Sequence, residues 1–215
     1  WPQKFLSFST EKHYRGFAGV TTLVNKFKYP KAKCIFSYLA NLIITDLNDK
    51  NNTRIINLYY PNTDNTLYNG DNIKHTRRKI AMMIDYYINK STIITGDFNF
   101  VLNNTDRWSI KNGYKLNSSD ISMIEDWSTM MTHPLIDLNS TSHHESTFSH
   151  YRRSNKLITS KSRLDRAYIP TPSSYKLFKT KYIESLSDHK CLQIRITLSK
   201  ENSRFTHDDI LNYDL

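Results

Sequence analysis

The residues most capable of chemistry end a short apolar run at 92–99, which reads TIITGDFN. Its β-branched residues are typical of a buried strand, and Gly96 lets the backbone turn at the strand end. Asp97 and Asn99, two residues apart in extended chain, point the same way. A carboxylate and an amide so placed can hold a water or metal ion with one group and a phosphate oxygen with the other. An Asp/Asn turn that only closes a strand would have the same residues.

Two more motifs offer groups that could hold a phosphate. Tyr59 ends a β-rich run in the sequence Tyr59-Tyr60-Pro61-Asn62, where its phenol can donate a hydrogen bond to a phosphate oxygen. Asp165 lies between Arg163 and Arg166, whose guanidiniums would keep the carboxylate ionised and offer paired donors to phosphate. The alternative for Asp165 is a surface salt bridge, worth about 0–1 kcal/mol.

Asp188 and His189 place a carboxylate beside an imidazole, immediately before an alternating strand pattern. Taken alone, Ser187-Asp188-His189 is more typical of a turn than of a catalytic pair. Thr147-Phe148 is a weaker motif, in which a hydroxyl beside an aromatic ring could support a neighbouring acid. No spacing typical of a metal site links the following histidines, which we expect in surface or hydrogen-bonded loops: His133, His143, His144 and His150.

The sequence between these motifs predicts alternating strands and helices. Strand patterns occupy 16–24, 35–47, 53–60, 92–97, 146–149, 163–169 and 192–198. Apolar residues at helical spacing predict one helix over 73–88, with Arg77 on its polar face, and a second over 119–131. The polar segment 48–52 has the length of a hairpin turn, and 103–117 is expected to be a loop. Strands that alternate with helices and also pair through hairpins predict an α/β sandwich with mixed sheets.

Length and charge narrow the class of protein. A chain of 215 residues can bury a single-domain core without disulfides, and the unpatterned Cys34 and Cys191 favour a reducing compartment. No apolar stretch approaches the ~20 residues that span a bilayer. Residues 151–190 carry +7 of the net charge of +10, from ten basic and three acidic side chains. This local excess predicts a partner that presents phosphates, although charged segments are often plain solvated surface.

Taken in order, the motifs Tyr-x-Pro-Asn, Gly-Asp-Phe-Asn, Thr-Phe, Arg-Leu-Asp and Ser-Asp-His resemble those of the endonuclease/exonuclease/phosphatase superfamily. Within it, the chain is most similar to the apurinic-endonuclease-like domain of LINE-type (non-LTR) retrotransposons. The resemblance extends from about Gly16 to Leu198. It implies a four-layer α/β sandwich, with two mixed β-sheets face to face and flanking helices. It also implies hydrolysis of DNA phosphodiesters that depends on Mg²⁺ or Mn²⁺ and leaves a 3′-hydroxyl and a 5′-phosphate.

The resemblance gives each motif residue a role. Asp97 would orient or deprotonate the attacking water, and Asn99 would bind the scissile phosphate. His189 would contact a phosphate oxygen, and Asp165 would orient its imidazole and favour the charged form. Tyr59 would donate a hydrogen bond to the phosphate. Such an arrangement is chemically coherent, because phosphodiester hydrolysis needs an aligned nucleophile and neutralisation of the developing charge.

The resemblance also implies ligands and partners. Asp188, together with Asp97, would hold the metal ion, and Arg163, Arg166 and Asn62 would contact the nucleic acid. DNA is the expected partner, with a reverse transcriptase in the parent element, and we expect a monomer with no membrane association. A nuclease of this kind would be intracellular and act in the nucleus.

The segment 1–15 departs from the family's pattern. The family has one strand there with an asparagine, and a second whose glutamate, in a Gln-Glu-Thr type motif, is the principal metal ligand. Glu11 is the only acidic residue in this segment, and its polar context is not strand-like. We therefore expect 1–200 to be an N-terminally incomplete domain that lacks its first strands and is impaired in metal binding. Residues 201–215 would form a C-terminal tail or linker.

Two other functions fit the same motifs. One is a catalytically inactive remnant that binds nucleic acid. The other is a phosphodiesterase or phosphatase of the same superfamily that acts on a lipid or inositol phosphate. The concentrated basic segment favours a nucleic-acid backbone over a single head group.

Overall fold

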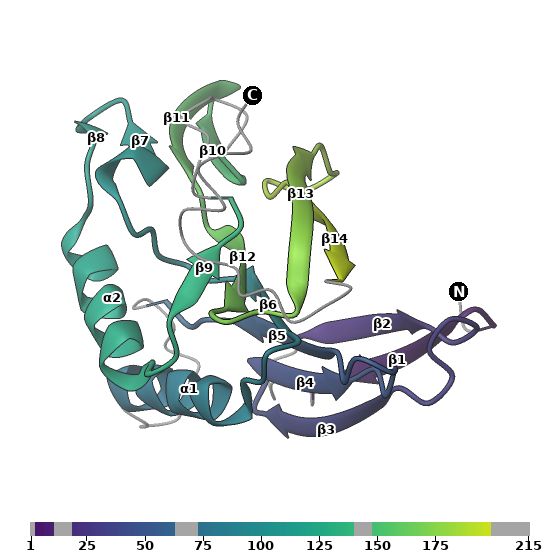
Figure 1. Ribbon diagram of the computed structural model, residues 1–215. Coiled ribbons are helices and arrows are strands. Elements are labelled where there is room, and N and C mark those ends of the chain that lie inside the picture. Colours follow the sequence, from purple (N-terminus) through teal and green to yellow (C-terminus); the bar gives the residue numbers. More distant parts are fainter. Residues whose placement is uncertain (1–2, 11–18, 63–72, 140–147, 199–215) are drawn as a thin grey trace.

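A six-stranded mixed sheet lies at the centre of the computed structural model, which describes residues 3–10, 19–62, 73–139 and 148–198 (Figure 1). Its strands lie in the order β3 (Lys33–Tyr38), β4 (Leu42–Asp46), β5 (Arg54–Tyr59), β6 (Thr92–Asp97), β12 (Asp165–Pro170) and β9 (Leu135–Asp137). β5 and β6 are parallel, and every other neighbouring pair in this sheet is antiparallel.

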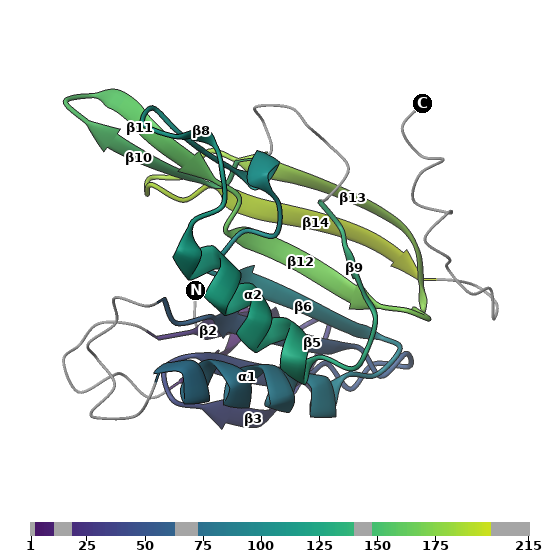
Figure 2. The same ribbon diagram turned by 90° about the vertical axis from the view of Figure 1, so that its left-hand side faces the viewer.

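Both described α-helices cover one face of this sheet (Figure 2). α1 (Ile73–Tyr87) lies in the connection between the parallel strands β5 and β6, and α2 (Ser118–Met130) packs beside it. α2 begins with a capping box, in which the side chains of Asn117 and Asp120 each accept the other's backbone N–H. The larger hydrophobic core lies between helices and sheet and includes Ile44, Ile56, Ile80, Ile84, Phe98, Phe100 and Trp127.

The predicted polar face of α1 is partly buried against α2. The side chain of Arg77 is 2% exposed, and its Nη2 lies 2.6 Å from Oδ2 of the fully buried Asp126. Arg78 reaches Oδ1 of the same carboxylate at 3.0 Å. A buried carboxylate requires such partners, and helical spacing alone could not show that a second helix supplies it.

The opposite face of the central sheet carries two antiparallel strand pairs, β13 (Tyr175–Ile183) with β14 (Cys191–Leu198) and β1 (Phe5–Ser9) with β2 (Thr21–Asn25). Apolar residues of β14 pack there on a smaller core that includes Ile93, Ile136, Ala167 and Ile169. Asn57 of β5 binds β2, because its Nδ2 donates to the carbonyl of Thr21 at 3.1 Å. The two pairs form the second β layer (Figure 1).

A separate four-stranded sheet consists of β10 (His150–Ser154), β11 (Leu157–Ser162), β7 (Arg107–Ser109) and β8 (Gly113–Tyr114), in that order. The hairpin of β10 and β11 turns at Asn155 and Lys156, both with positive φ, and extends beyond the central sheet in Figure 2. β11 is followed at once by β12, so this hairpin leads directly into the strand that begins with Asp165.

The mixed α/β class predicted from the sequence is confirmed, as are both helices and the strands predicted at 53–60, 92–97, 163–169 and 192–198. The pattern over 35–47 is two strands, because Leu39 adopts a φ of 48° and turns the chain between β3 and β4. Residues 103–117 contain η1 (Asn104–Asp106), β7 and β8 rather than a loop alone. The second β layer is two separate pairs, and both described helices lie on the same side.

The remaining predictions are either not found in the structure or concern residues outside its described part. The strand predicted over 146–149 is not found at Phe148 and Ser149, which precede β10. Gly16, Glu11, Thr147 and the tail 201–215 lie outside the described residues. None of the described helices is both long enough and apolar enough to cross a membrane.

Candidate active site

The strand register brings three of the predicted site residues into one row. Tyr59 of β5 pairs with Asp97 of β6, and Asp97 pairs with Asp165 of β12. Because residues opposite each other in neighbouring strands point to the same face, the three side chains share the face that carries β1, β2, β13 and β14. Three separate motifs thus meet at one end of the sheet.

Gly96 makes this row possible. Its φ is +145°, and a Cβ added there would lie 1.9 Å from the carbonyl oxygen of Leu58 in the adjacent strand. No other residue type can accept that approach without moving the backbone. The glycine therefore sets the spacing of β5 and β6 immediately before Asp97.

Asp165 binds His189 directly. Its Oδ2 lies 2.7 Å from Nδ1 of His189, in an ion pair whose side chains are 20% and 31% exposed. The hydrogen bond to Asp165 raises the pKa of His189 above its ordinary value. Since Nδ1 is engaged by the carboxylate, Nε2 is the ring nitrogen left for a substrate or ion. The predicted partnership of these two residues is present in the structure.

Ser149 fixes the position of Asp165. The serine is fully buried, and its Oγ accepts the backbone N–H groups of Leu164 and Asp165, both at 2.9 Å. Its carbonyl accepts the N–H of Lys190 at 2.6 Å, next to His189. One residue therefore links the backbone on both sides of the carboxylate–imidazole pair, a role that no motif in the sequence indicated.

Asp97 has an environment suited to proton exchange near neutral pH. Burial, and then the neighbouring charge of Asp165, raise its pKa to about 6, against the opposing effect of His189. Its Oδ1 accepts the backbone N–H of Asn99 at 2.8 Å. A carboxylate with a pKa in this range can accept a proton from a water molecule.

The amide of Asn99 is turned toward the protein. The residue has a φ of 55°, and its Nδ2 donates to the carbonyl of Tyr60 at 2.8 Å. This hydrogen bond supports the turn after β6 and leaves Oδ1 as the acceptor end of the amide. Asn62 follows β5 and is half-buried, as is Tyr59.

Arg163 and Arg166 were predicted to contact nucleic acid, and the structure contradicts both predictions because both side chains are buried. Arg163 is 2% exposed. It donates through Nε and Nη2 to the two carboxylate oxygens of Asp106, at 2.8 and 2.9 Å, and through Nη1 to Asp137 at 2.8 Å. The two arginines therefore do not flank Asp165 as free phosphate donors.

Arg166 is fully buried on the helix-covered face of the central sheet. Its guanidinium carbon lies 4.7 Å from the ring centre of Phe98 and 4.5 Å from that of Phe100, and Nη2 donates to the Phe100 carbonyl at 2.6 Å. Stacking on aromatic faces stabilises a desolvated guanidinium. Strand alternation explains the position, since Arg166 points to the face opposite Asp165.

His150 is a site residue that sequence reasoning missed. Its backbone forms an antiparallel bridge with His189, and the two ring centres are 4.7 Å apart. His150 Nε2 lies 3.5 Å from Oδ2 of Asp188, whose side chain is 66% exposed. Burial, and then the charge of His189, lower the pKa of His150. The prediction that His150 is a plain loop histidine is wrong, because β10 reaches this cluster through pairing that sequence spacing does not report.

Asp188 was predicted to hold a metal ion together with Asp97. Among the described residues, the group with suitably close ligand atoms is His150, Asp188 and His189, whose atoms lie within 4.8 Å of one another, and Asp97 is not a member of it. Asp188 thus extends the site toward β10, while Asp97 remains beside Asp165 in the sheet.

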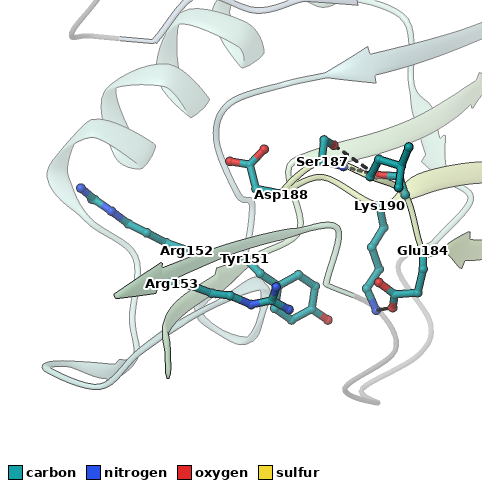
Figure 3. Close-up of a pocket in the computed structure, with 9 residues that line it drawn as sticks. Tyr151, Arg152, Arg153, Glu184, Ser187, Asp188 and Lys190 are labelled. Atoms are coloured by element: carbon teal, nitrogen blue, oxygen red, sulfur yellow. Dashed lines mark hydrogen bonds and ion pairs between the residues drawn. The ribbon is translucent and has the colours of Figure 1, made fainter. Parts of the chain in front are cut away.

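A pocket of about 500 Å³ opens beside Asp188, between β10 and the turn that joins β13 to β14 (Figure 3). Lys190 forms an ion pair with Glu184, Nζ to Oε1 at 2.8 Å, and its Nζ lies 4.9 Å from the centre of the Tyr151 ring. The lining thus combines cationic and aromatic groups, which suits a nucleic-acid strand. Its residues are Tyr151, Arg152, Arg153, Glu184, Ser185, Leu186, Ser187, Asp188 and Lys190.

An α/β sandwich with an Asp-supported imidazole beside a second carboxylate, at the end of its central sheet, has the groups that a hydrolytic nuclease or phosphatase needs. The chain belongs to the Endonuclease/Exonuclease/phosphatase family, whose model matches residues 9–189. A search of curated proteins found no matching sequence. The superfamily inferred from the ordered motifs is therefore confirmed.

Several solved structures share the fold. The endonuclease domain of TRAS1, a telomere-specific non-LTR retrotransposon, aligns with a TM-score of 0.61 and 11% identity, covering 92% of this chain and 82% of that domain. The 3′ phosphatase NExo from Neisseria, bound to a product DNA hairpin, gives 0.60 at 11% identity over 92% and 80%. TDP2 from D. rerio, with a single-strand DNA product, gives 0.53 at 11% identity over 90% and 78%. At this identity the likeness concerns the fold.

Proposed function

We propose that this protein is a divalent-metal-dependent endonuclease that hydrolyses DNA phosphodiester bonds and leaves a 3′-hydroxyl and a 5′-phosphate. The observation that carries the proposal is the row of Tyr59, Asp97 and Asp165 with His189 bound to Asp165. Family membership supports hydrolysis of a phosphate ester. The shared fold with a retrotransposon endonuclease domain and with proteins solved with DNA product supports a DNA substrate.

In this mechanism Asp97 accepts a proton from a water molecule, whose oxygen forms the new bond to phosphorus while the P–O3′ bond breaks and O3′ takes a proton from solvent to leave as the 3′-hydroxyl. The raised pKa of Asp97, about 6, is matched to that task near neutral pH. Protonated His189, held by Asp165, donates from Nε2 to a non-bridging phosphate oxygen. Tyr59 and Asn99 lie beside Asp97, where the Tyr59 hydroxyl and the second N–H of the Asn99 amide would donate to the phosphate; the other N–H of that amide is held by the Tyr60 carbonyl.

A divalent metal ion would neutralise charge on the phosphate and the leaving oxygen. Hard cations such as Mg²⁺ take one or two carboxylates and complete their shell with water and phosphate oxygens. The exposed carboxylate of Asp188 fits this requirement, because two-thirds of its side chain is open to solvent. Asp188 would be the main metal ligand among the described residues, and Asp97 would be the second carboxylate ligand.

The charge distribution favours an extended polyanion over a small head group. Arg152, Arg153 and Lys156 are exposed on the hairpin of β10 and β11, which extends away from the catalytic row. Phosphates spaced along a nucleic-acid strand could contact this hairpin and the catalytic end together. A single lipid or inositol phosphate could occupy only the catalytic end and would not reach the hairpin.

The test is nicking of supercoiled plasmid by the purified chain in Mg²⁺. We expect nicks that DNA ligase reseals, since ligation needs a 3′-hydroxyl and a 5′-phosphate. Asp97→Ala and His189→Ala should each lower the rate by about 10²–10³-fold or more. Lys50→Ala is the matched control, because Lys50 is exposed in the turn before β5, at the opposite end of the sheet.

Two results would overturn the proposal. Nicking that persists in both Asp97→Ala and His189→Ala would mean that the row is not catalytic. Release of phosphate from an inositol phosphate, with no nicking of DNA and loss of release in the same variants, would assign the site to a phosphatase.

A further inference from the structure

The cluster of His150, Asp188 and His189 has a ligand set that differs from what Mg²⁺ prefers. Two imidazoles and one carboxylate suit zinc and neighbouring transition metals, whereas Mg²⁺ takes oxygen ligands. The ligand atoms lie within 4.8 Å of one another, and His150 Nε2 lies 3.5 Å from Asp188 Oδ2. Ligands at about 2.0–2.1 Å from a tetrahedral ion are about 3.4 Å apart, so that pair already has the required spacing.

The backbone holds the cluster together before any ion binds. His150 and His189 form an antiparallel bridge, and the N–H of Tyr151 donates to the carbonyl of Asp188 at 3.0 Å. Two hairpins distant in sequence are thereby fixed at the point where their side chains converge. Little backbone ordering would be needed on binding, which favours affinity.

Asp165 orients the imidazole of His189 for metal binding. Histidine ligands usually donate their second ring nitrogen to a carboxylate, which fixes the tautomer and orients the ring toward the metal. His189 has this partner in Asp165, Nδ1 to Oδ2 at 2.7 Å. Nε2 is therefore the nitrogen presented to an ion.

We propose that His150, Asp188 and His189 form a three-ligand site for a zinc-class transition metal ion, with its remaining position open to water or a phosphate oxygen. The site shares Asp188 and His189 with the proposed catalytic machinery but does not require hydrolysis. One consequence does rest on the proposed function. Zinc at His189 Nε2 occupies the atom that contacts the substrate phosphate, so zinc should inhibit Mg²⁺-supported nicking.

Binding is tested on the metal-free full chain by calorimetry with Zn²⁺ and by visible absorption with Co²⁺. We expect one tight Zn²⁺ per chain and a tetrahedral Co²⁺ spectrum. His150→Ala and His189→Ala should each weaken Zn²⁺ binding at least about 100-fold and abolish the Co²⁺ spectrum. Asp165→Asn, which removes no ligand, should weaken binding by about 10–100-fold. Far-ultraviolet circular dichroism verifies that each variant is folded.

Two control variants locate the ion. His75 is exposed on α1, and Cys191 carries a free thiol two residues from His189. Neither belongs to the proposed ligand set, so His75→Ala and Cys191→Ser should bind Zn²⁺ as the wild type does. Unchanged affinity in folded His150→Ala, or equal loss in either control, overturns the assignment. Absence of nicking with intact Zn²⁺ binding overturns the proposed function alone, and nicking without Zn²⁺ binding overturns this inference alone.

Discussion

Arg163 offers the sharpest test of the structure, because its burial reverses the role that the sequence suggested. Its guanidinium neutralises two carboxylates, those of Asp106 and Asp137, whose side chains are 13% and 9% exposed. Arg163→Ala would leave both largely buried and unpaired. Breaking a buried pair in this way costs about 3–5 kcal/mol, a large part of the about 5–15 kcal/mol that stabilises a typical domain. For a chain of this length we expect Tm to fall by about 6–20 °C.

The assay is urea unfolding followed by circular dichroism, with DNA affinity measured on the same preparations. Arg163→Lys keeps the charge but cannot make the paired donation to Asp106, so we expect an intermediate loss that remains measurable if the alanine variant does not fold. Arg152→Ala is the matched control, since Arg152 is exposed on β10. It should change stability by less than about 0.5 kcal/mol and weaken DNA binding instead. An Arg163→Ala variant with wild-type stability and reduced DNA affinity would refute the reasoning.

Three further predictions concern the row of Tyr59, Asp97 and Asp165 and the residues that support it. Ionisation of Asp97 opposes folding, because the pKa of its carboxyl is raised to about 6 in the folded protein. The resulting loss of folding free energy is absent below the ordinary pKa of an aspartate, grows as the pH rises and is complete above about pH 6. Asp97→Asn should therefore abolish nicking yet stabilise the metal-free protein by up to about 3 kcal/mol near pH 7.5 and by about 1 kcal/mol near pH 4.5, and an equal gain at both pH values would contradict this. Ser149→Ala leaves two backbone N–H groups unpaired beside Asp165, so we expect a loss of about 1–3 kcal/mol in stability. If Asp165 then holds His189 less well, the pKa of His189 falls, and the alkaline limb of the pH profile of nicking, which needs protonated His189, should move to lower pH; a drop in stability with an unchanged pH profile would limit Ser149 to a structural role. Gly96→Ala should lower both stability and nicking, since its Cβ would meet the carbonyl of Leu58 at 1.9 Å, and wild-type activity in this variant would show that the spacing of β5 and β6 is not critical.

Part of the site could be predicted because it depends on local sequence. Asp97 follows a β-branched run, Tyr59 closes a strand before a proline, and Asp165 begins one. Strand ends are readable from turn residues and from the period of two in side-chain direction. The order of the motifs then identified the family, and with it the pairing of Asp165 with His189.

Two of the predictions that failed, those for Arg163 and His150, concern residues whose partners come from elsewhere in the chain. Arg163 pairs with Asp106 and Asp137, 57 and 26 residues away. Charge along the sequence cannot distinguish such a buried pair from a surface contact. His150 likewise gains its place through a bridge to His189, on another hairpin. In both cases the relevant distance is set by strand pairing.

By itself, the sequence determined the strand and helix pattern around the motifs, the α/β class and the catalytic candidates, because these follow from periodicity and from short motifs in fixed order. The tertiary structure alone decided which charges are buried, that Ser149 supports Asp165, and that His150 joins Asp188 and His189. The physical reason is that burial and side-chain partnership depend on the packing of segments far apart in the chain, which local spacing does not encode.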